Sequence, residues 1–253
     1  MLLSRGLSRV VASMSATDRP VAAALKDVLA RVDAASTKGS RPEQTRLVAV
    51  SKTKPNEAIE ECYEAGHRCF GENYVQELLD KAPALPKDIQ WHFIGHLQSN
   101  KVKAIVEGVL NLAMVETVDS AKLADKIDKA VAAAGRTSPL SVMVQVNTSG
   151  EESKNGVEPG DVVPLARHIA TQCKNLRLAG LMTIGMPDYT SRPENFVCLA
   201  TCRSEVAADL GVPVESLELS MGMSGDFEQA VEMGSTNVRV GSTIFGARDY
   251  SKK

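Results

Sequence analysis

The chain has 253 residues, of which 43% are hydrophobic and 24% are charged, so its composition is that of a globular protein rather than a disordered one. The 29 basic and 31 acidic residues give a net charge of −2, which leaves no cationic surplus for nucleic acid or an anionic membrane. No apolar run approaches the roughly 18–20 residues of a membrane-spanning helix, and the cysteines without a C-x-x-C spacing favour a reducing compartment.

Residues 1–17 differ from the rest of the chain. They contain arginines and serines but no acidic residue, and their leucines and valines could form one apolar helical stripe. This bias is typical of an organellar targeting leader, and a disordered N-terminal extension is the alternative. We therefore expect a cytoplasmic protein, with import into mitochondria or another organelle left open by residues 1–17.

A regular alternation of helices and short apolar strands follows the leader. The pattern predicts an opening helix over about 20–38. The predicted strands are 47–51, 68–71, 89–94, 111–118, 140–146, 176–184, 216–219 and 238–245. The predicted helices between them are 55–65, 73–81, 98–107, 120–134, 159–171, 193–210 and 226–233.

Strands that alternate with helices pair in parallel through crossover connections. Eight such units in a chain of this length predict an α/β fold, a single (β/α)8 TIM-type barrel with an extra N-terminal helix. A doubly wound open sheet is the rival fold, but no G-x-G-x-x-G follows the first strand. No linker or internal repeat divides residues 18–253, so we expect one barrel domain there.

In a barrel, functional side chains gather where the strands end. Lys52 follows the first predicted strand in phase with Val48 and Val50, so its ammonium group should point into the barrel if these valines do. A buried ammonium group must pair with an acid, lose its proton or react. Two interpretations stay open: a salt bridge with Glu72 or Glu116, or an amine that forms an imine with an aldehyde or ketone.

Small residues mark the ends of the seventh and eighth strands. Ser224 lies in the loop 220–226 before a helix, whereas Gly241 allows close backbone approach and Ser242 supplies a hydroxyl. These two loops are where barrels most often bind a phosphate group. The alternative is a plain turn in which Ser224 caps the next helix.

Arg239 alternates with Val238 and Val240. If the valines face the outer helices, the guanidinium group faces the barrel interior, where it needs a carboxylate such as Glu72 or an atom of a bound ligand. A lysine after strand one, a phosphate cradle and an inward arginine on strand eight together describe a pyridoxal phosphate site.

His92 and His96 have the H-x3-H spacing that aligns two metal ligands on a helix. The residues between them are typical of a strand that runs into a loop, and the sequence offers no evident third ligand. We therefore expect no metal site.

Seven segments resemble a known family: LVAVSKTKP (47–55), FGENYVQE (70–77), WHFIGHLQSNK (91–101), VQVNTSGEESKNG (144–156), GLMTIG (180–185), LSMGMSGDFEQAVEMGST (219–236) and VRVGSTIFGARDY (238–250). They are closely similar to the pyridoxal phosphate homeostasis proteins, also called proline synthetase co-transcribed homologues. The resemblance extends from about residue 18 to residue 253. It implies a fold-type III barrel like the N-terminal domain of alanine racemase, with pyridoxal phosphate bound as a Schiff base.

The resemblance also implies roles for individual residues. Lys52 of the SKTKP motif would form the Schiff base, and Asn73 of the GEN motif would lie beside the cofactor. The phosphate group would be bound by Ser224, Gly241 and Ser242. Arg239 would face the pyridine nitrogen.

An arginine at the pyridine nitrogen disfavours protonation of that nitrogen and so makes the ring a poorer electron sink. A racemase also needs an acid–base group on the opposite face of the cofactor. Alanine racemases take it from an added C-terminal domain of a partner subunit, whereas this chain ends soon after Gly246.

From these features and the resemblance we expect a protein that is not an enzyme and that stores, buffers or delivers pyridoxal phosphate. We expect a monomer or weak dimer whose partners are pyridoxal-phosphate-dependent acceptor enzymes, and no binding to nucleic acid or membrane. One alternative is a racemase or lyase of low activity, with Glu72 or His92 as its acid–base group. The other is an aldolase-type barrel that forms a Schiff base with a sugar phosphate.

Overall fold

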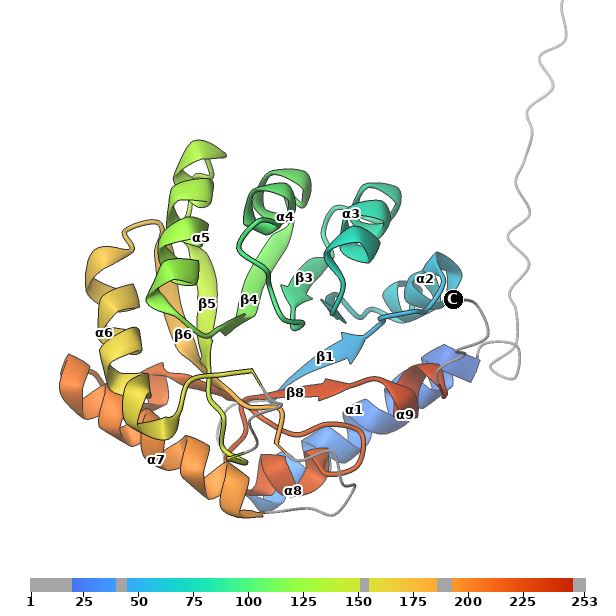
Figure 1. Cartoon of the computed structure of the whole chain (residues 1–253). Coiled ribbons are helices and arrows are strands. Elements are labelled where there is room, and N and C mark those ends of the chain that lie inside the picture. Colours follow the sequence, from blue (N-terminus) through green and yellow to red (C-terminus); the bar gives the residue numbers. More distant parts are fainter. Residues whose placement is uncertain (1–19, 40–44, 151–154, 186–192, 248–253) are drawn as a thin grey trace, which may run out of the picture.

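The computed structural model describes residues 20–39, 45–150, 155–185 and 193–247, which form a closed barrel of eight parallel strands surrounded by helices (Figure 1). The strands follow one another around the barrel in chain order, and pairing between β8 and β1 closes it. Their bounds are Arg46–Val50 (β1), Cys69–Glu72 (β2), Gln90–Phe93 (β3), Leu112–Val118 (β4), Leu140–Gln145 (β5), Leu176–Met182 (β6), Glu218–Ser220 (β7) and Asn237–Val240 (β8). The predicted barrel is therefore confirmed, whereas the predicted leader at 1–17 lies outside the described residues.

The helices alternate with the strands. Their bounds are Pro20–Lys38 (α1), Asn56–Glu64 (α2), Val75–Ala84 (α3), Val102–Gly108 (α4), Ala121–Ala133 (α5), Val162–Gln172 (α6), Pro193–Leu210 (α7), Phe227–Glu232 (α8) and Ser242–Phe245 (α9), with short 3-10 helices at Pro159–Asp161 and Val214–Ser216. The extra helix α1 packs against α8 and α9, which Figure 1 shows alongside it. It also packs against α2.

Successive side chains of each strand point to opposite faces, and this alternation divides the interior into two regions. Leu47 and Ala49 on β1, with Val238 and Val240 on β8, join the main hydrophobic core between the strands and the helices. A smaller apolar cluster, which the alternation places inside the barrel, comprises Met114, Met143, Ala179 and Met182. Beside it the barrel interior is polar, and this polar region borders the candidate site.

The structure corrects two boundaries that affect the site. The predicted strand 238–245 ends at Val240, and after Gly241 the chain turns into the short helix α9. A β-carbon at Gly241 would lie 3.3 Å from the carbonyl oxygen of Val50, so a glycine suits this turn beside β1. At the other strand, β1 ends at Val50, and Lys52 is half-buried in a turn rather than in phase with the strand.

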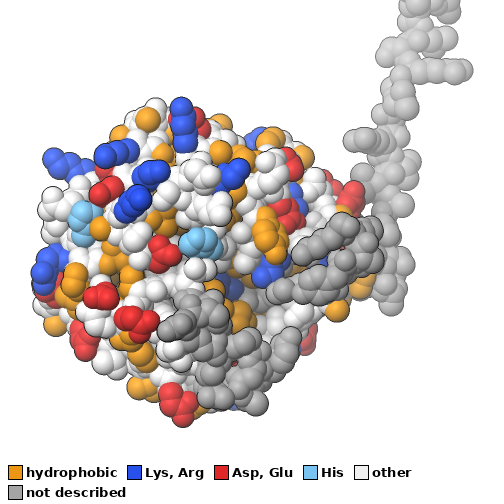
Figure 2. All heavy atoms as spheres, viewed as in Figure 1, with side chains coloured by type: hydrophobic (Ala, Val, Ile, Leu, Met, Phe, Trp, Pro, Cys, Tyr) orange, Lys and Arg blue, Asp and Glu red, His pale blue; other side chains and the backbone are white. Residues whose placement is uncertain are grey.

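Within the described ranges, no helix is both long and apolar enough to cross a membrane. Figure 2 shows lysine and arginine side chains interspersed with aspartate and glutamate over one face of the molecule. Basic side chains are more frequent in the upper left of this view, and acidic side chains are more frequent in the lower left.

Candidate functional site

The turn that carries Lys52 follows directly from β1. The Lys54 N–H donates to the Ser51 carbonyl at 3.0 Å, so Lys52 and Thr53 are the two central residues of a β-turn. Thr53 has a φ of 62°, a left-handed conformation that β-branched residues rarely adopt. Its N–H donates to Glu77 Oε1 at 2.6 Å, which ties this unusual residue to α3.

Glu72, at the end of β2, is fully buried beside this turn. Its Oε1 accepts hydrogen bonds from Ser51 Oγ at 2.6 Å and from Lys81 Nζ at 2.8 Å. Burial raises the pKa of Glu72 against the opposing effect of Lys81. The lysine that pairs with Glu72 is thus Lys81 of α3, whereas the sequence suggested Lys52. Its i, i+4 spacing from Glu77 is the only local signal that could have found it.

Asn73 is the first residue after β2. The Oδ1 atom is buried and has no hydrogen-bond partner among the described residues. The backbone of Asn73 packs so tightly against Gly95 that a β-carbon at Gly95 would lie 2.0 Å from the Asn73 carbonyl oxygen. Glycine at position 95 therefore allows the Asn73 backbone to lie this close to the loop after β3.

The loops after β7 and β8 meet at the position predicted for a phosphate. Ser224 Oγ accepts a hydrogen bond from the Gly241 N–H at 3.2 Å. The N-cap of α8 is Asp226, whose carboxylate accepts from the Met223 N–H at 2.6 Å. Ser224 therefore joins the two loops instead of capping α8, and Ser242 begins α9 one residue beyond the contact.

Arg239 is buried inside the barrel, as the alternation of β8 predicts. Its guanidinium group donates to Ser220 Oγ at 2.5 Å and to the Thr183 carbonyl at 2.7 Å, so neither acceptor is the expected Glu72. Burial lowers the pKa of Arg239 against the opposing effect of Glu116, and the guanidinium group keeps its charge at any ordinary pH.

Glu116 of β4 is the carboxylate that compensates this charge. It is fully buried and accepts from His92 Nδ1 at 2.6 Å, Ser220 Oγ at 2.5 Å and Asn237 Nδ2 at 3.2 Å. Burial opposes its ionisation, but His92, Arg239 and Ser220 together hold the pKa of Glu116 below its usual range. Neither Ser220 nor Asn237 was assigned a role from the sequence, although Asn237 is in phase with Arg239 on β8.

His92 completes this buried group. Burial disfavours its imidazolium form, but Cys69 and Glu116 favour it more strongly and raise the pKa of His92 to about 10. His96 lies 3.7 Å from a different acid, Asp119, so the two histidines do not converge on one point.

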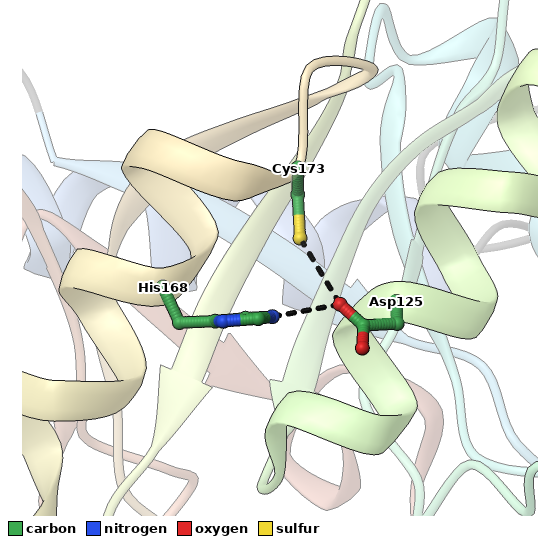
Figure 3. Close-up of side chains that lie close together, drawn as sticks. All are labelled: Asp125, His168 and Cys173. Carbon is green, nitrogen blue, oxygen red and sulfur yellow. Dashed lines mark hydrogen bonds and ion pairs between the residues drawn. The ribbon is translucent and has the colours of Figure 1, made fainter.

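Three other possible metal ligands do approach one another on the outside of the barrel (Figure 3). Asp125 of α5 accepts from His168 of α6 at 2.7 Å, and the Cys173 sulfur lies 3.9 Å from the same oxygen. The hydrogen bond between His168 and Asp125 accounts for the approach of these two residues, which are far along the chain from the predicted site residues.

The barrel and the site together define a class of protein. The family model described as "Alanine racemase, N-terminal domain" matches residues 23–249, so the chain belongs to this family.

Individual relatives narrow the class. The chain is 55% identical over 219 residues to the Mus musculus "Pyridoxal phosphate homeostasis protein", covering 83% of this chain and 79% of the relative. It is 51% identical over 252 residues to the Homo sapiens protein of the same name, covering 95% and 91% respectively. The structure of PipY from Synechococcus elongatus PCC7942 with PLP bound is 34% identical, with a TM-score of 0.71 over 89% of this chain and 100% of PipY. The chain is a member of the pyridoxal phosphate homeostasis protein family.

Proposed function

We propose that this chain binds pyridoxal 5'-phosphate and acts in intracellular homeostasis of that cofactor by storing, buffering or delivering it. The proposal extends to a Schiff base between the cofactor and Lys52. The observation that carries it is the hydrogen bond between Ser224 Oγ and the Gly241 N–H, because it joins the two loops predicted to bind a phosphate. Since β8 pairs with β1, this contact lies beside the strand that leads to Lys52.

The described residues fit a phosphorylated pyridine aldehyde. Ser224, Gly241 and Ser242 would bind its phosphate group, and the buried Asn73 Oδ1 would gain a donor that the described residues do not supply. Arg239 would face the pyridine nitrogen and keep it unprotonated. When bound, the cofactor supplies an aldehyde that an amine can attack, and Lys52 is the amine proposed here.

Two features support binding rather than turnover. A permanently charged Arg239 beside the ring would weaken it as an electron sink. The acids and bases considered as alternative catalytic groups are also engaged, because Glu72 pairs with Lys81 and His92 pairs with Glu116, and Glu72 and His92 are both buried. A proton donor or acceptor must reach its substrate, and these contacts already occupy Glu72 Oε1 and His92 Nδ1.

Borohydride reduction tests the linkage. Protein incubated with pyridoxal phosphate should show a visible absorbance band that reduction removes, and mass spectrometry should place the reduced adduct on Lys52. Lys54→Ala is the matched control, because Lys54 lies in the same turn and donates to the Ala247 carbonyl at 2.8 Å. It should keep the adduct, whereas Lys52→Ala should lose it. A band that persists in Lys52→Ala would refute the assigned linkage.

The alternative function is a racemase or lyase of low activity that uses the same site. Its support is the family itself, since the matching family model is named for alanine racemase. Loss of α-deuterium from labelled amino acids, abolished by Lys52→Ala, would favour the alternative over a homeostasis role.

We also propose that apo forms of pyridoxal-phosphate-dependent enzymes receive the cofactor and that the protein is a monomer or weak dimer in the cytoplasm. Reactivation of an apoenzyme faster than by the same concentration of free cofactor would support direct delivery. Light scattering after size exclusion tests the oligomeric state. Fluorescent fusions with and without residues 1–17 test whether that segment directs the protein to an organelle.

A further inference from the structure

The turn that carries Lys52 is held on both sides by charged residues that the proposed function does not use. Ser51 precedes Lys52, and its carbonyl accepts from Lys81 Nζ at 2.9 Å while its hydroxyl donates to Glu72 at 2.6 Å. Thr53 follows Lys52, and its N–H donates to Glu77 at 2.6 Å. Each neighbour of Lys52 is therefore fixed from outside the turn.

The three residues that hold the turn also bind one another. The Lys81 ammonium group donates to Glu72 Oε1 at 2.8 Å and to Glu77 Oε1 at 2.5 Å, in addition to the Ser51 carbonyl. An ammonium group has three N–H donors, so these acceptors use all of them. We call Glu72, Glu77 and Lys81 the α3 clamp, since Glu77 and Lys81 lie on α3 and Glu72 ends the strand before it.

The backbone of the turn explains why a clamp is needed. A positive φ at a non-glycine residue costs on the order of 1–3 kcal/mol and persists only where the surroundings enforce it. Thr53 has such a φ, 62°, at the third turn position, where glycine or asparagine is usual. The hydrogen bond from the Thr53 N–H to Glu77 is the contact with α3 that opposes relaxation of this residue.

We propose that the α3 clamp positions Lys52 for attack on an aldehyde, with Lys81 and Glu77 as positioning residues. This inference rests on the proposed function only in naming the aldehyde as pyridoxal phosphate. Lys81 is 6% exposed and lies between two carboxylates. If its ammonium group moved away from the Ser51 carbonyl, buried Glu72 would lose its counter-ion. Removing the clamp should let the turn relax and move the Lys52 amine from its productive direction.

Two measurements on the full chain test this inference. The first is the rate at which pyridoxal phosphate, trapped by borohydride, labels Lys52. A misplacement near 1 Å can cost 10²-fold in rate, so we expect Lys81→Met and Glu77→Ala to label at least about tenfold more slowly. Glu77→Gln keeps an acceptor for the Thr53 N–H and should label at nearly the rate of the unchanged protein.

The second measurement is hydrogen exchange in the peptide that contains residues 51–54. Exchange there should become faster in Lys81→Met and Glu77→Ala but not in Glu77→Gln. Lys103→Met is the helix control, because Lys103 forms an exposed i, i+4 ion pair with Glu107 on α4 at 3.8 Å. Arg46→Met is the stability control, because it breaks the Arg46–Glu218 ion pair at the opposite end of β1. Both controls should leave labelling and exchange unchanged.

The outcomes separate the clamp from the proposed function. If the unchanged protein is not labelled at Lys52, the proposed function fails, and faster exchange at residues 51–54 in the variants still supports a clamp on the turn. Labelling of the variants at the unchanged rate would overturn the inference. Slower labelling with unchanged exchange would also overturn it, because the effect would not pass through the turn.

Discussion

Replacing the buried carboxylate of Glu116 should lower the free energy of unfolding of the barrel. The change is Glu116→Gln, which keeps the size of the side chain but removes its charge. Glu116 is fully buried between the imidazole of His92 and the hydroxyl of Ser220, which in turn binds Arg239. Loss of the carboxylate leaves the buried guanidinium group of Arg239 without its counter-ion, whereas His92 can release its proton. Breaking a buried ion pair from one side costs roughly 3–5 kcal/mol, so we expect a loss of that size in the free energy of unfolding.

The assay is equilibrium unfolding in guanidinium chloride, followed by tryptophan fluorescence. The chain has one tryptophan, Trp91, which is fully buried on β3 next to His92 and so reports on the barrel itself. Glu107→Gln is the surface control, because Glu107 pairs with the exposed Lys103 at 3.8 Å. A loss for Glu116→Gln within the roughly 0.5 kcal/mol of an ordinary surface substitution would refute the reasoning.

The free energy of unfolding should also depend on pH through His92 and Glu116. His92 has its pKa raised from 6.5 to about 10, so its contribution is fully present below 6.5 and is lost as the pH rises towards 10. Glu116 has a lowered pKa, so its contribution is present above 4.5 and is lost as the pH falls below that value. The unchanged protein should therefore lose stability between pH 6.5 and 10, and Glu116→Gln should lose less over this interval. Equal slopes for the two proteins would contradict the assigned pair.

Three further substitutions address the site. Gly95→Ala should weaken cofactor binding, because its β-carbon would lie 2.0 Å from the Asn73 carbonyl oxygen; Gly160→Ala, with no atom within 4 Å of the added carbon, should leave the dissociation constant unchanged. Thr53→Gly should raise the free energy of unfolding by up to about 1 kcal/mol in the same fluorescence assay, because glycine adopts the φ of 62° without strain. Ser224→Ala should weaken binding of pyridoxal phosphate more than binding of pyridoxal, and equal losses for both ligands would exclude a phosphate contact.

Much of the fold could be predicted because its signals are local. Short apolar strands and amphipathic helices alternate in the sequence, and the alternation on β8 correctly places Arg239 inside the barrel between outward Val238 and Val240. Extending the same alternation beyond Val50 failed for Lys52, because the chain leaves the strand and enters a turn there. Periodicity describes a residue only while the regular element continues.

The partners of the buried charges could not be predicted for a different reason. Glu116 finds its partners on β3, β7 and β8, at separations of up to 121 residues. Lys81 of α3 donates to the carbonyl of Ser51, which lies 30 residues earlier in the chain. No pattern within a helix or strand encodes these pairings, because they arise only when the closed barrel brings the strand ends together. The sequence identified the residue types that need partners, and the fold selects which partners they obtain.

The Lys52 amine and the Arg239 guanidinium group are supported by two hydrogen-bond networks, and the contacts described above for one network include no residue of the other. Lys52 is positioned through Ser51 and Thr53 by residues of β2 and α3, whereas Arg239 is positioned through Ser220 by residues of β3, β4 and β8. Substitutions in separate networks add in their effect on stability, while those within one network do not. Glu77→Ala should therefore add to Glu116→Gln in the free energy of unfolding, whereas Asn237→Ala should cost less in the Glu116→Gln background than alone. Separate networks let the reactive amine be displaced while the interior of the barrel stays intact, so slower capture of the cofactor and loss of the fold are distinguishable in this protein.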